Sequence, residues 1–471
     1  MDERHPFAPH AAMSEDLALD LAQCIVGTRY ESLDGGAVEA AKKSVLDLLG
    51  VTLAASGIEP AAGRVVELVR ESGGASQSTI IGFGDRVPAP WAAFANGVMA
   101  HSLDYDDLTP WGSHASSSIV PAALAIAERA GGVSGRELIA AIAVGQDLFA
   151  RLLCNVNWRK DWNPSTVFGV LAATAAAARV ARLSLDQTRN ALSIASLQSS
   201  GTMEVIFGVG GDLRGMYAGF SAKSAVLAVL LAQRGIAGPA SWLEGRAGFL
   251  PTFFREGFDR DGMRRDLGRD HLGRTTLYKP WPAVGTAHSH IHATIQLVTQ
   301  HRLQPEDIAS IRIHAGDNQM IMCTPLESRR APSTLVDAKF SLPFLVAVAA
   351  VRRDVRISDF TSSALADARV LATAQKVVPV EDAAYDWNGE LPLGRVVIGT
   401  RDGRTLDLVG RSVPGSAEAP LGWDRILQKF ADCASVAARV PADEQVQRAQ
   451  RMAPRLETLE DATELMRIVS A

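Results

Sequence analysis

Apolar residues recur at spacings of three and four between residues 14 and 248, which is the period of an amphipathic α-helix. The pattern predicts one helix after another, and Pro164 fits the first position of a helix that runs to residue 182. Asp212 is expected to cap the helix that ends near residue 235. Many apolar faces consist of Ala, Gly and Ser, so these helices are expected to pack closely in a large bundle.

The pattern changes in the second half of the chain. Residues 308–314 alternate between apolar and polar positions as a strand does. Residues 395–410 are typical of a β-hairpin that turns at Asp402 and Gly403, and residues 337–352 have a helical pattern. A helical pattern also returns near the C-terminus.

This order of elements predicts a mainly α fold in two parts. A large all-α domain is formed by both ends of the chain, residues 14–274 and 412–471, because the C-terminal helices most simply rejoin the first ones. A smaller α+β domain, residues 275–411, is inserted between them.

Composition and charge narrow the class of protein. The 471 residues are 47% hydrophobic and 21% charged, as in compact soluble proteins. A net charge of −5 without a basic run argues against a nucleic-acid partner, and the apolar stretches fall short of the ~20 residues of a membrane helix. Residues 1–13 form a loose tail without the apolar segment of a signal peptide, and the four cysteines have no metal-binding spacing. We expect a cytoplasmic protein with reduced thiols and no membrane contact.

One fourteen-residue segment concentrates ionisable groups between two predicted helices: His101, Asp104, Asp106, Asp107 and His114. Such acids can simply cap helix ends. Three acids within four residues also raise one another's pKa, which would supply a general base or a proton-sharing partner for His114. A metal site is the third interpretation, and it ranks last because the spacing is not distinctive.

Three other segments offer further chemistry. Lys279 lies in YKPWP, where two prolines hold it in an extended segment suited to anchoring a carboxylate. His288 and His292 lie four apart, but the glutamate of a zinc-protease motif is absent, so zinc is not expected. Arg214 follows the glycines of residues 208–211, whose free N–H groups could help it to hold a carboxylate.

Several motifs in this order resemble the MmgE/PrpD family. They are ANGVMAHSLDYDD followed by His114, SLDQTRNALSIASLQSSG, GMYAGFSAKSAVLAVLLAQRGIAGPASWLEGRAGF, YKPWPAVGTAHSHIHA and DAKFSLPFLVAVA. The resemblance covers nearly the whole chain. It implies an all-α main domain made by both chain ends, an inserted α+β lid domain, a homodimer, and no metal or organic cofactor.

The resemblance also implies roles for single residues. Asp104, His114 and Lys279 match the family's Asp, His and Lys and would be catalytic. The expected substrate-binding residues are His101, Asn163, Arg214, Tyr278 and His288.

Four positions depart from the family pattern. Asn163 stands where the family has a histidine, and Arg214 where it has a lysine. Leu108 and Val284 replace a threonine and a histidine of the decarboxylase. Asparagine cannot exchange a proton near neutral pH, whereas arginine keeps a cation in a planar fork that suits a carboxylate. Decarboxylation loses most support from these changes, and dehydration of a 2-methylcitrate-like substrate is weakened.

The remaining prediction is proton abstraction next to a carboxylate of a small di- or tricarboxylate. Asp104 or His114 would be the base, while Lys279 and Arg214 would hold carboxylates and stabilise the intermediate. Loss of β-hydroxide would make the protein a cofactor-independent hydro-lyase, which we favour; reprotonation on the opposite face would make it an epimerase or isomerase. A non-catalytic carboxylate-binding homologue is the alternative from a different class.

Overall fold

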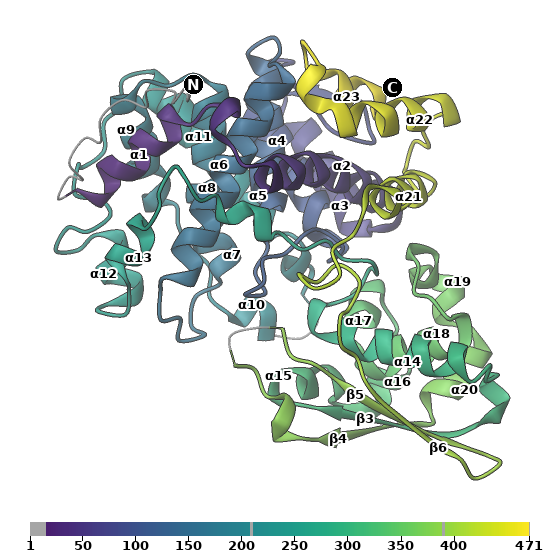
Figure 1. The fold of residues 1–471 in the computed structure, drawn as a ribbon. Coiled ribbons are helices and arrows are strands. Elements are labelled where there is room, and N and C mark those ends of the chain that lie inside the picture. Colours follow the sequence, from purple (N-terminus) through teal and green to yellow (C-terminus); the bar gives the residue numbers. More distant parts are fainter. Residues whose placement is uncertain (1–15, 208–210, 389–390, 471) are drawn as a thin grey trace, which may run out of the picture.

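The computed structural model describes residues 16–207, 211–388 and 391–470. The predicted N-terminal tail and residues 208–210 of the predicted carboxylate cradle lie outside the described residues. Two units are visible, a larger helical one and a smaller one that contains a sheet (Figure 1). The prediction of a mainly helical chain is confirmed.

The larger unit contains helices from both ends of the chain. The first group of these helices is α1 Leu17–Gly27, α2 Gly35–Ile58, α3 Pro60–Ser72, α4 Ala89–Ser102, α5 Ser116–Arg129, α6 Gly135–Cys154, α7 Pro164–Val167, α8 Gly169–Val180, α9 Leu185–Leu197, α10 Glu204–Phe207, α11 Tyr217–Gln233, α12 Phe249–Phe254 and α13 Arg260–Arg264. The C-terminal group is α21 Trp423–Ala434, α22 Asp443–Met452 and α23 Glu464–Ile468.

One hydrophobic core joins the two groups, and it includes Leu17 of α1 together with Phe430 of α21 and Leu465 of α23. Small residues bring some helices very close, as the sequence predicts. A Cβ atom on Gly97 of α4 would lie 2.8 Å from the Cα atom of Gly219 in α11, so this crossing requires glycine. A short ribbon, β1 Ser78–Thr79 and β2 Arg86–Val87, interrupts the otherwise helical unit.

The smaller unit has its own core around a four-stranded sheet in the order β4-β3-β5-β6. The strands are β3 Ile308–Ala315, β4 Val377–Glu381, β5 Arg395–Thr400 and β6 Thr405–Val409. β3 and β4 are parallel, and the other two pairs are antiparallel. The predicted strand and hairpin therefore occur where the alternation placed them.

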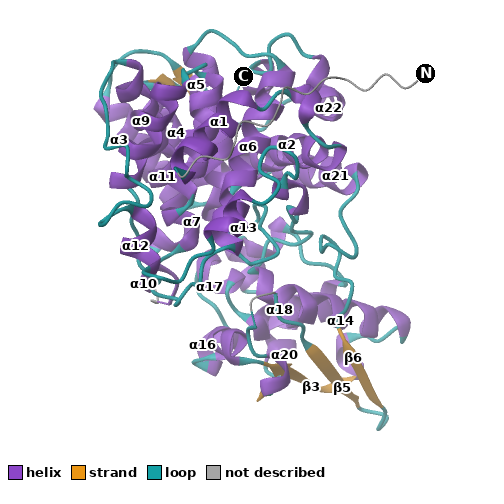
Figure 2. Cartoon of the chain, turned by 60° about the vertical axis from the view of Figure 1, so that its left-hand side comes forward, coloured by secondary structure: helices purple, strands orange, loops and turns teal. Residues whose placement is uncertain are grey.

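Helices cover the face of this sheet that is turned toward the larger unit (Figures 1 and 2). They are α14 His288–Gln300, α15 Asp317–Met320, α16 Leu326–Arg330, α17 Leu335–Lys339, α18 Leu342–Arg352, α19 Ser362–Leu365 and α20 Ala368–Ala374. Among them α14 and α18 pack directly on the sheet.

Three helix predictions need correction. The Asp212 side chain does not cap α11: it lies in a separate 3₁₀ turn and pairs with Arg64, while Met216 precedes the helix without a side-chain cap. The predicted helix 337–352 is two helices, because the Ser341 hydroxyl accepts a hydrogen bond from the N–H of Phe344 and starts α18 anew.

The helix predicted from Pro164 to residue 182 is also divided, into α7 and α8 at Phe168. Within the described part of the chain no single helix has the length and apolarity of a membrane span. α2 and α3 meet those criteria only as a pair, and they are bent by 93° where they join.

Candidate active site

The ionisable segment lies in the loop between α4 and α5, and this loop is buried. α4 ends at Ser102, and Asp104 then takes a left-handed backbone conformation with φ of 50°. Asp is one of the few residues that tolerate this region, and such strained residues gather at functional sites. The turn directs the next carboxylates and His114 back toward the end of α4.

Asp106 joins the two histidines of the segment. Its carboxylate lies 3.0 Å from Nδ1 of His101 and 3.1 Å from Nδ1 of His114. Because a carboxylate only accepts hydrogen bonds, both Nδ1 atoms must carry protons. Burial would raise the pKa of Asp106, but the two imidazoles hold it well below its ordinary value. Asp106 is therefore a fixed negative charge that orients both rings.

The two histidines that contact the Asp106 carboxylate have different pKa values. Burial would lower the pKa of His114, but Asp106 raises it above the ordinary value of 6.5. For His101 burial prevails and lowers the pKa. At neutral pH His114 is thus the better proton donor, and His101 is neutral.

Asp104 lies between His114 and Lys279. Its Oδ1 atom is 3.4 Å from Nε2 of His114 and 2.7 Å from Nζ of Lys279, which also donates to the Asp104 carbonyl at 2.7 Å. Burial would raise the pKa of Asp104, but the neighbouring cations lower it below 3.8. Its Oδ2 atom is buried and has no hydrogen-bond partner among the described residues. Asp104 is consequently an ionised carboxylate with one oxygen available.

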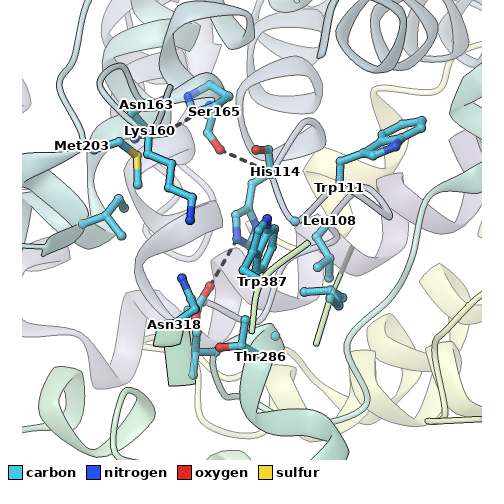
Figure 3. Close-up of a pocket in the computed structure, with 18 of the residues that line it drawn as sticks. Leu108, Trp111, His114, Lys160, Asn163, Ser165, Met203, Thr286, Asn318 and Trp387 are labelled. Carbon is cyan, nitrogen blue, oxygen red and sulfur yellow. Dashed lines mark hydrogen bonds and ion pairs between the residues drawn. The ribbon is translucent and has the colours of Figure 1, made fainter. Parts of the chain in front are cut away.

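A cavity of about 330 Å³ opens beside these groups, between the two units. Of the predicted residues, His101, Asp104, His114, Asn163 and Arg214 line it. The smaller unit contributes to the same cavity from loops and helix ends, and Figure 3 shows Thr286, Asn318 and Trp387 on that side.

Asn163 and Arg214 are partly engaged in local structure. The Asn163 side chain caps α7 by accepting from the N–H of Ser165 at 3.0 Å, while its buried Nδ2 has no partner among the described residues. The Arg214 guanidinium lies 3.4 Å from the ring centre of Phe340 and donates to the Ile206 carbonyl. Burial lowers the pKa of Arg214 to about 10. Both residues line the cavity, and Nδ2 of Asn163 and Nε of Arg214 have no partner among the described residues.

The other predicted residues lie behind the cavity wall. The Tyr278 hydroxyl donates to the Ala40 carbonyl at 2.6 Å, and Nε2 of His288 donates to the Ala283 carbonyl at 3.1 Å. Burial lowers the pKa of His288 to about 3. Together with Lys279 these residues line a second cavity of about 280 Å³. Their predicted contact with substrate stays a prediction.

The cluster also bears on metal binding. Potential ligand atoms of His101, Asp104, Asp106 and His114 lie within 4.8 Å of one another. A cation there would have to lie beside the Lys279 ammonium, and both Nδ1 atoms already face Asp106. The donor set thus fits proton transfer better than a metal, and the expectation of a metal-free protein stays a prediction.

Several cavity residues were not found from the sequence. Lys160, with φ of 62°, extends into the cavity from the loop before α7 (Figure 3). The Ser165 hydroxyl accepts a hydrogen bond from the main-chain N–H of His114. Trp387 comes from the smaller unit and packs on Gly112, where a Cβ atom would lie 2.6 Å from its ring. The glycine at position 112 was the only local signal in the sequence, because long-range contacts leave no sequence pattern.

Comparison with known proteins assigns the chain to a family. The model of the MmgE/PrpD N-terminal domain matches residues 19–261, and that of the MmgE/PrpD C-terminal domain matches residues 281–457. A cis-aconitate decarboxylase from Mus musculus is 26% identical over 97% of this chain and 94% of its own length. One from Homo sapiens is 30% identical over 50% of each chain, and one from Aspergillus terreus is 24% identical over 83% of each. Because the two family models span nearly the whole sequence, the chain belongs to the MmgE/PrpD family.

Proposed function

We propose that the protein is a cofactor-independent lyase that removes a proton from the carbon next to a carboxylate of a small di- or tricarboxylate. The observation that carries the proposal is the contact of Asp104 Oδ1 with Nε2 of His114, at the wall of a cavity between the two units. An ionised carboxylate beside a protonated imidazole supplies both a base and an acid.

The hydrogen bonds favour Asp104 as the base. Nδ1 of His114 faces Asp106 and the Asp107 carbonyl, so a neutral ring would turn the Nε2 lone pair toward the Asp104 carboxylate. The lone pair of Nε2 and the Asp104 carboxylate would then repel each other. The raised pKa of His114 avoids this repulsion, because it keeps a proton on Nε2 that faces Asp104. Asp104 then accepts the substrate proton through its unpartnered Oδ2, and His114 donates its proton to the leaving hydroxyl.

Cations near the cavity would hold the substrate and the charge that develops on it. The buried Nε atom of Arg214 has no partner among the described residues, and Lys160 extends into the cavity. The unused Nδ2 of Asn163 is a further donor for a carboxylate oxygen. Fixed donors aimed at a developing aci-carboxylate are the largest catalytic term in many enzymes of this kind. Lys279 acts indirectly, because its ammonium holds Asp104.

The smaller unit would act as a lid. Asn318 and Trp387 belong to it and line the same cavity as His114, so its approach closes the site against water. The homodimer implied by the family resemblance belongs to the same proposal.

Decarboxylation is the second candidate. It is favoured by the names of relatives that match 97% and 83% of the chain, both of which are cis-aconitate decarboxylases. We place dehydration first because Leu108 and Val284 replace a threonine and a histidine of the decarboxylase, whereas the base and acid of an elimination are both present.

Proton NMR in deuterated water over a panel of hydroxylated and unsaturated di- and tricarboxylates, with imino acids included, separates the reactions. Dehydration gives an alkene and water, decarboxylation gives a product one carbon shorter, and epimerisation gives deuterium exchange alone. We expect alkene formation from a β-hydroxy acid. Exchange without product would contradict the lyase, and binding without any exchange would identify a non-catalytic homologue.

A further inference from the structure

The cavity has an apolar side that proton transfer does not use. We define the apolar wall as Leu108, Val284, Leu391 and Trp387, all of which line the cavity. A Cβ atom on Gly285 would lie 3.3 Å from Cδ1 of Leu108 and 3.6 Å from Cδ2 of Leu391, so these two side chains converge on the backbone next to Val284. Three of the four residues come from the smaller unit.

Trp387 is held in place from two directions. Its ring packs on Gly112, whose absent Cβ would lie 2.6 Å from Cη2. The main-chain N–H of Trp387 donates to Oδ1 of Asp317 at 2.9 Å. The hydrogen bond positions the Trp387 backbone and Gly112 supports one side of the ring, so the indole lies against the larger unit at the cavity (Figure 3).

The cations that line the cavity are too few for a compact tricarboxylate. Among the described lining residues, only Arg214 and Lys160 are permanently charged cations. Lys279 is already bound to Asp104. The protonated His114 ring is already engaged by the Asp104 and Asp106 carboxylates. The carboxylates of Asp104 and Asp317 line the cavity as well. Two cations match two carboxylates, and a third carboxylate would lie against the apolar wall at a high desolvation cost.

The size of the cavity agrees with a substrate larger than a bare four-carbon diacid. About 330 Å³ lies within the range of about 300–1,000 Å³ of clefts that bury drug-sized ligands. A bare diacid would leave the apolar wall in contact with water or empty space, without the attraction that close packing supplies.

We propose that the substrate is a dicarboxylate that bears an alkyl or aryl substituent larger than methyl, which lies on the apolar wall. The inference rests on the proposed function for the position of the carboxylates. The substituent determines selectivity, because each buried methylene contributes about fourfold in affinity, equivalent to ~0.8 kcal/mol. The reacting carbon stays beside Asp104.

Calorimetric binding of unreactive analogues tests the inference apart from turnover. The probes are succinate, tricarballylate, 2-butylsuccinate and 2-benzylsuccinate. We expect 2-benzylsuccinate to bind on the order of a hundredfold more tightly than succinate, and 2-butylsuccinate to fall between them. Equal or tighter binding of succinate or tricarballylate would overturn the inference, and so would the failure of all four to bind.

A pair of matched variants locates the effect. Val284→Thr keeps the shape of the side chain and places a hydroxyl in the apolar wall, so the ratio of 2-benzylsuccinate to succinate affinity should fall about tenfold. Val440→Thr makes the same change at a position that is 62% exposed and should leave the ratio unchanged. An unchanged ratio in Val284→Thr would contradict the inference.

The same panel separates this inference from the proposed function. If 2-benzylsuccinate binds preferentially but no hydroxylated, substituted diacid exchanges deuterium or loses water, the lyase fails and the substrate class stands. If unsubstituted acids react faster than substituted ones, the lyase stands and the substrate class is wrong.

Discussion

Three carboxyl groups within four residues reach three different states because their environments differ. Lys279 and His114 lower the pKa of Asp104 against the effect of burial, and two imidazoles hold the pKa of Asp106 lower still. Asp107 accepts hydrogen bonds from Ser44 and Ser116 and forms no ion pair within the described part of the chain, and burial raises its pKa to about 7. A single residue type thus supplies a base, a fixed charge and a group that titrates near neutral pH.

The pH dependence of kcat/KM follows from two of these groups. Asp104 must be ionised, and its lowered pKa keeps it so until the pH falls below 3.8. His114 must be protonated, and its raised pKa means that this proton is lost only above pH 6.5. We therefore expect a plateau across mildly acidic pH and a decrease on the alkaline side. If kcat/KM instead rises with pH from 6 to 8, His114 is the base.

Asp106→Asn tests the fixed charge. The amide removes the negative charge that raises the pKa of His114. Its NH₂ group can also donate to Nδ1, which permits the His114 tautomer that lacks a proton on Nδ1. We expect kcat to fall by about 10²–10⁴-fold and the alkaline limb to move to lower pH. Asp212→Asn alters an exposed carboxylate that pairs with Arg64 and serves as the control. A normal pH profile in Asp106→Asn would show that Asp106 does not tune His114.

The sequence predicted which residues of the ionisable segment belong to the site, but not which role each of them has. Spacing placed Asp104 and His114 together, and the structure brings them into contact. Nothing in the sequence indicated that Lys279 would form an ion pair with Asp104, or that the Tyr278 hydroxyl would donate a hydrogen bond to the Ala40 carbonyl. Those contacts join residues more than 170 positions apart, which a local pattern does not encode.

At the scale of elements, the site is formed where two loops meet. The loop after α4 carries Gly112, and the loop before β5 carries Trp387, and the two pack against each other. This contact joins the larger unit to the smaller one at the mouth of the cavity.

Gly112→Ala tests this contact. The added Cβ would lie 2.6 Å from the Trp387 ring, so the indole must move and the apolar wall should lose part of its selectivity. Gly403→Ala is the matched control, since Gly403 has a φ of 88° against 84° for Gly112 but no atom within 4 Å of the new Cβ. Both should destabilise the fold by about 1–2 kcal/mol. Only Gly112→Ala should lower the ratio of kcat/KM for substituted over unsubstituted diacids; equal ratios would contradict the role of Trp387.

Helix boundaries were less predictable than helix existence. The apolar runs of residues 164–182 and 337–352 continue through Phe168 and Phe340 without a break in the sequence pattern. At Phe168 the helix divides where the ring of this residue packs on Phe254. In the second segment, the Ser341 side chain caps a new helix and competes with the preceding one for the same N–H groups.

At the scale of the whole molecule, the two chain ends share one core, and the segment between them has another. The change from helical to alternating periodicity predicted an inserted domain, because each core requires its own pattern of buried faces, and the predicted domain bounds stay a prediction. The cavity could not be predicted in the same way, since it lies between the two cores and depends on how they face each other.

The central claim is that Asp104 accepts the substrate proton and His114 donates one to the leaving group. Proton NMR in deuterated water measures the two events separately, as α-deuterium exchange and as alkene formation, in Asp104→Asn and His114→Gln. We expect Asp104→Asn to lose both by about 10²–10⁴-fold, and His114→Gln to lose alkene formation by a similar factor while exchange continues within about tenfold. Exchange that persists in Asp104→Asn but disappears in His114→Gln would contradict the account.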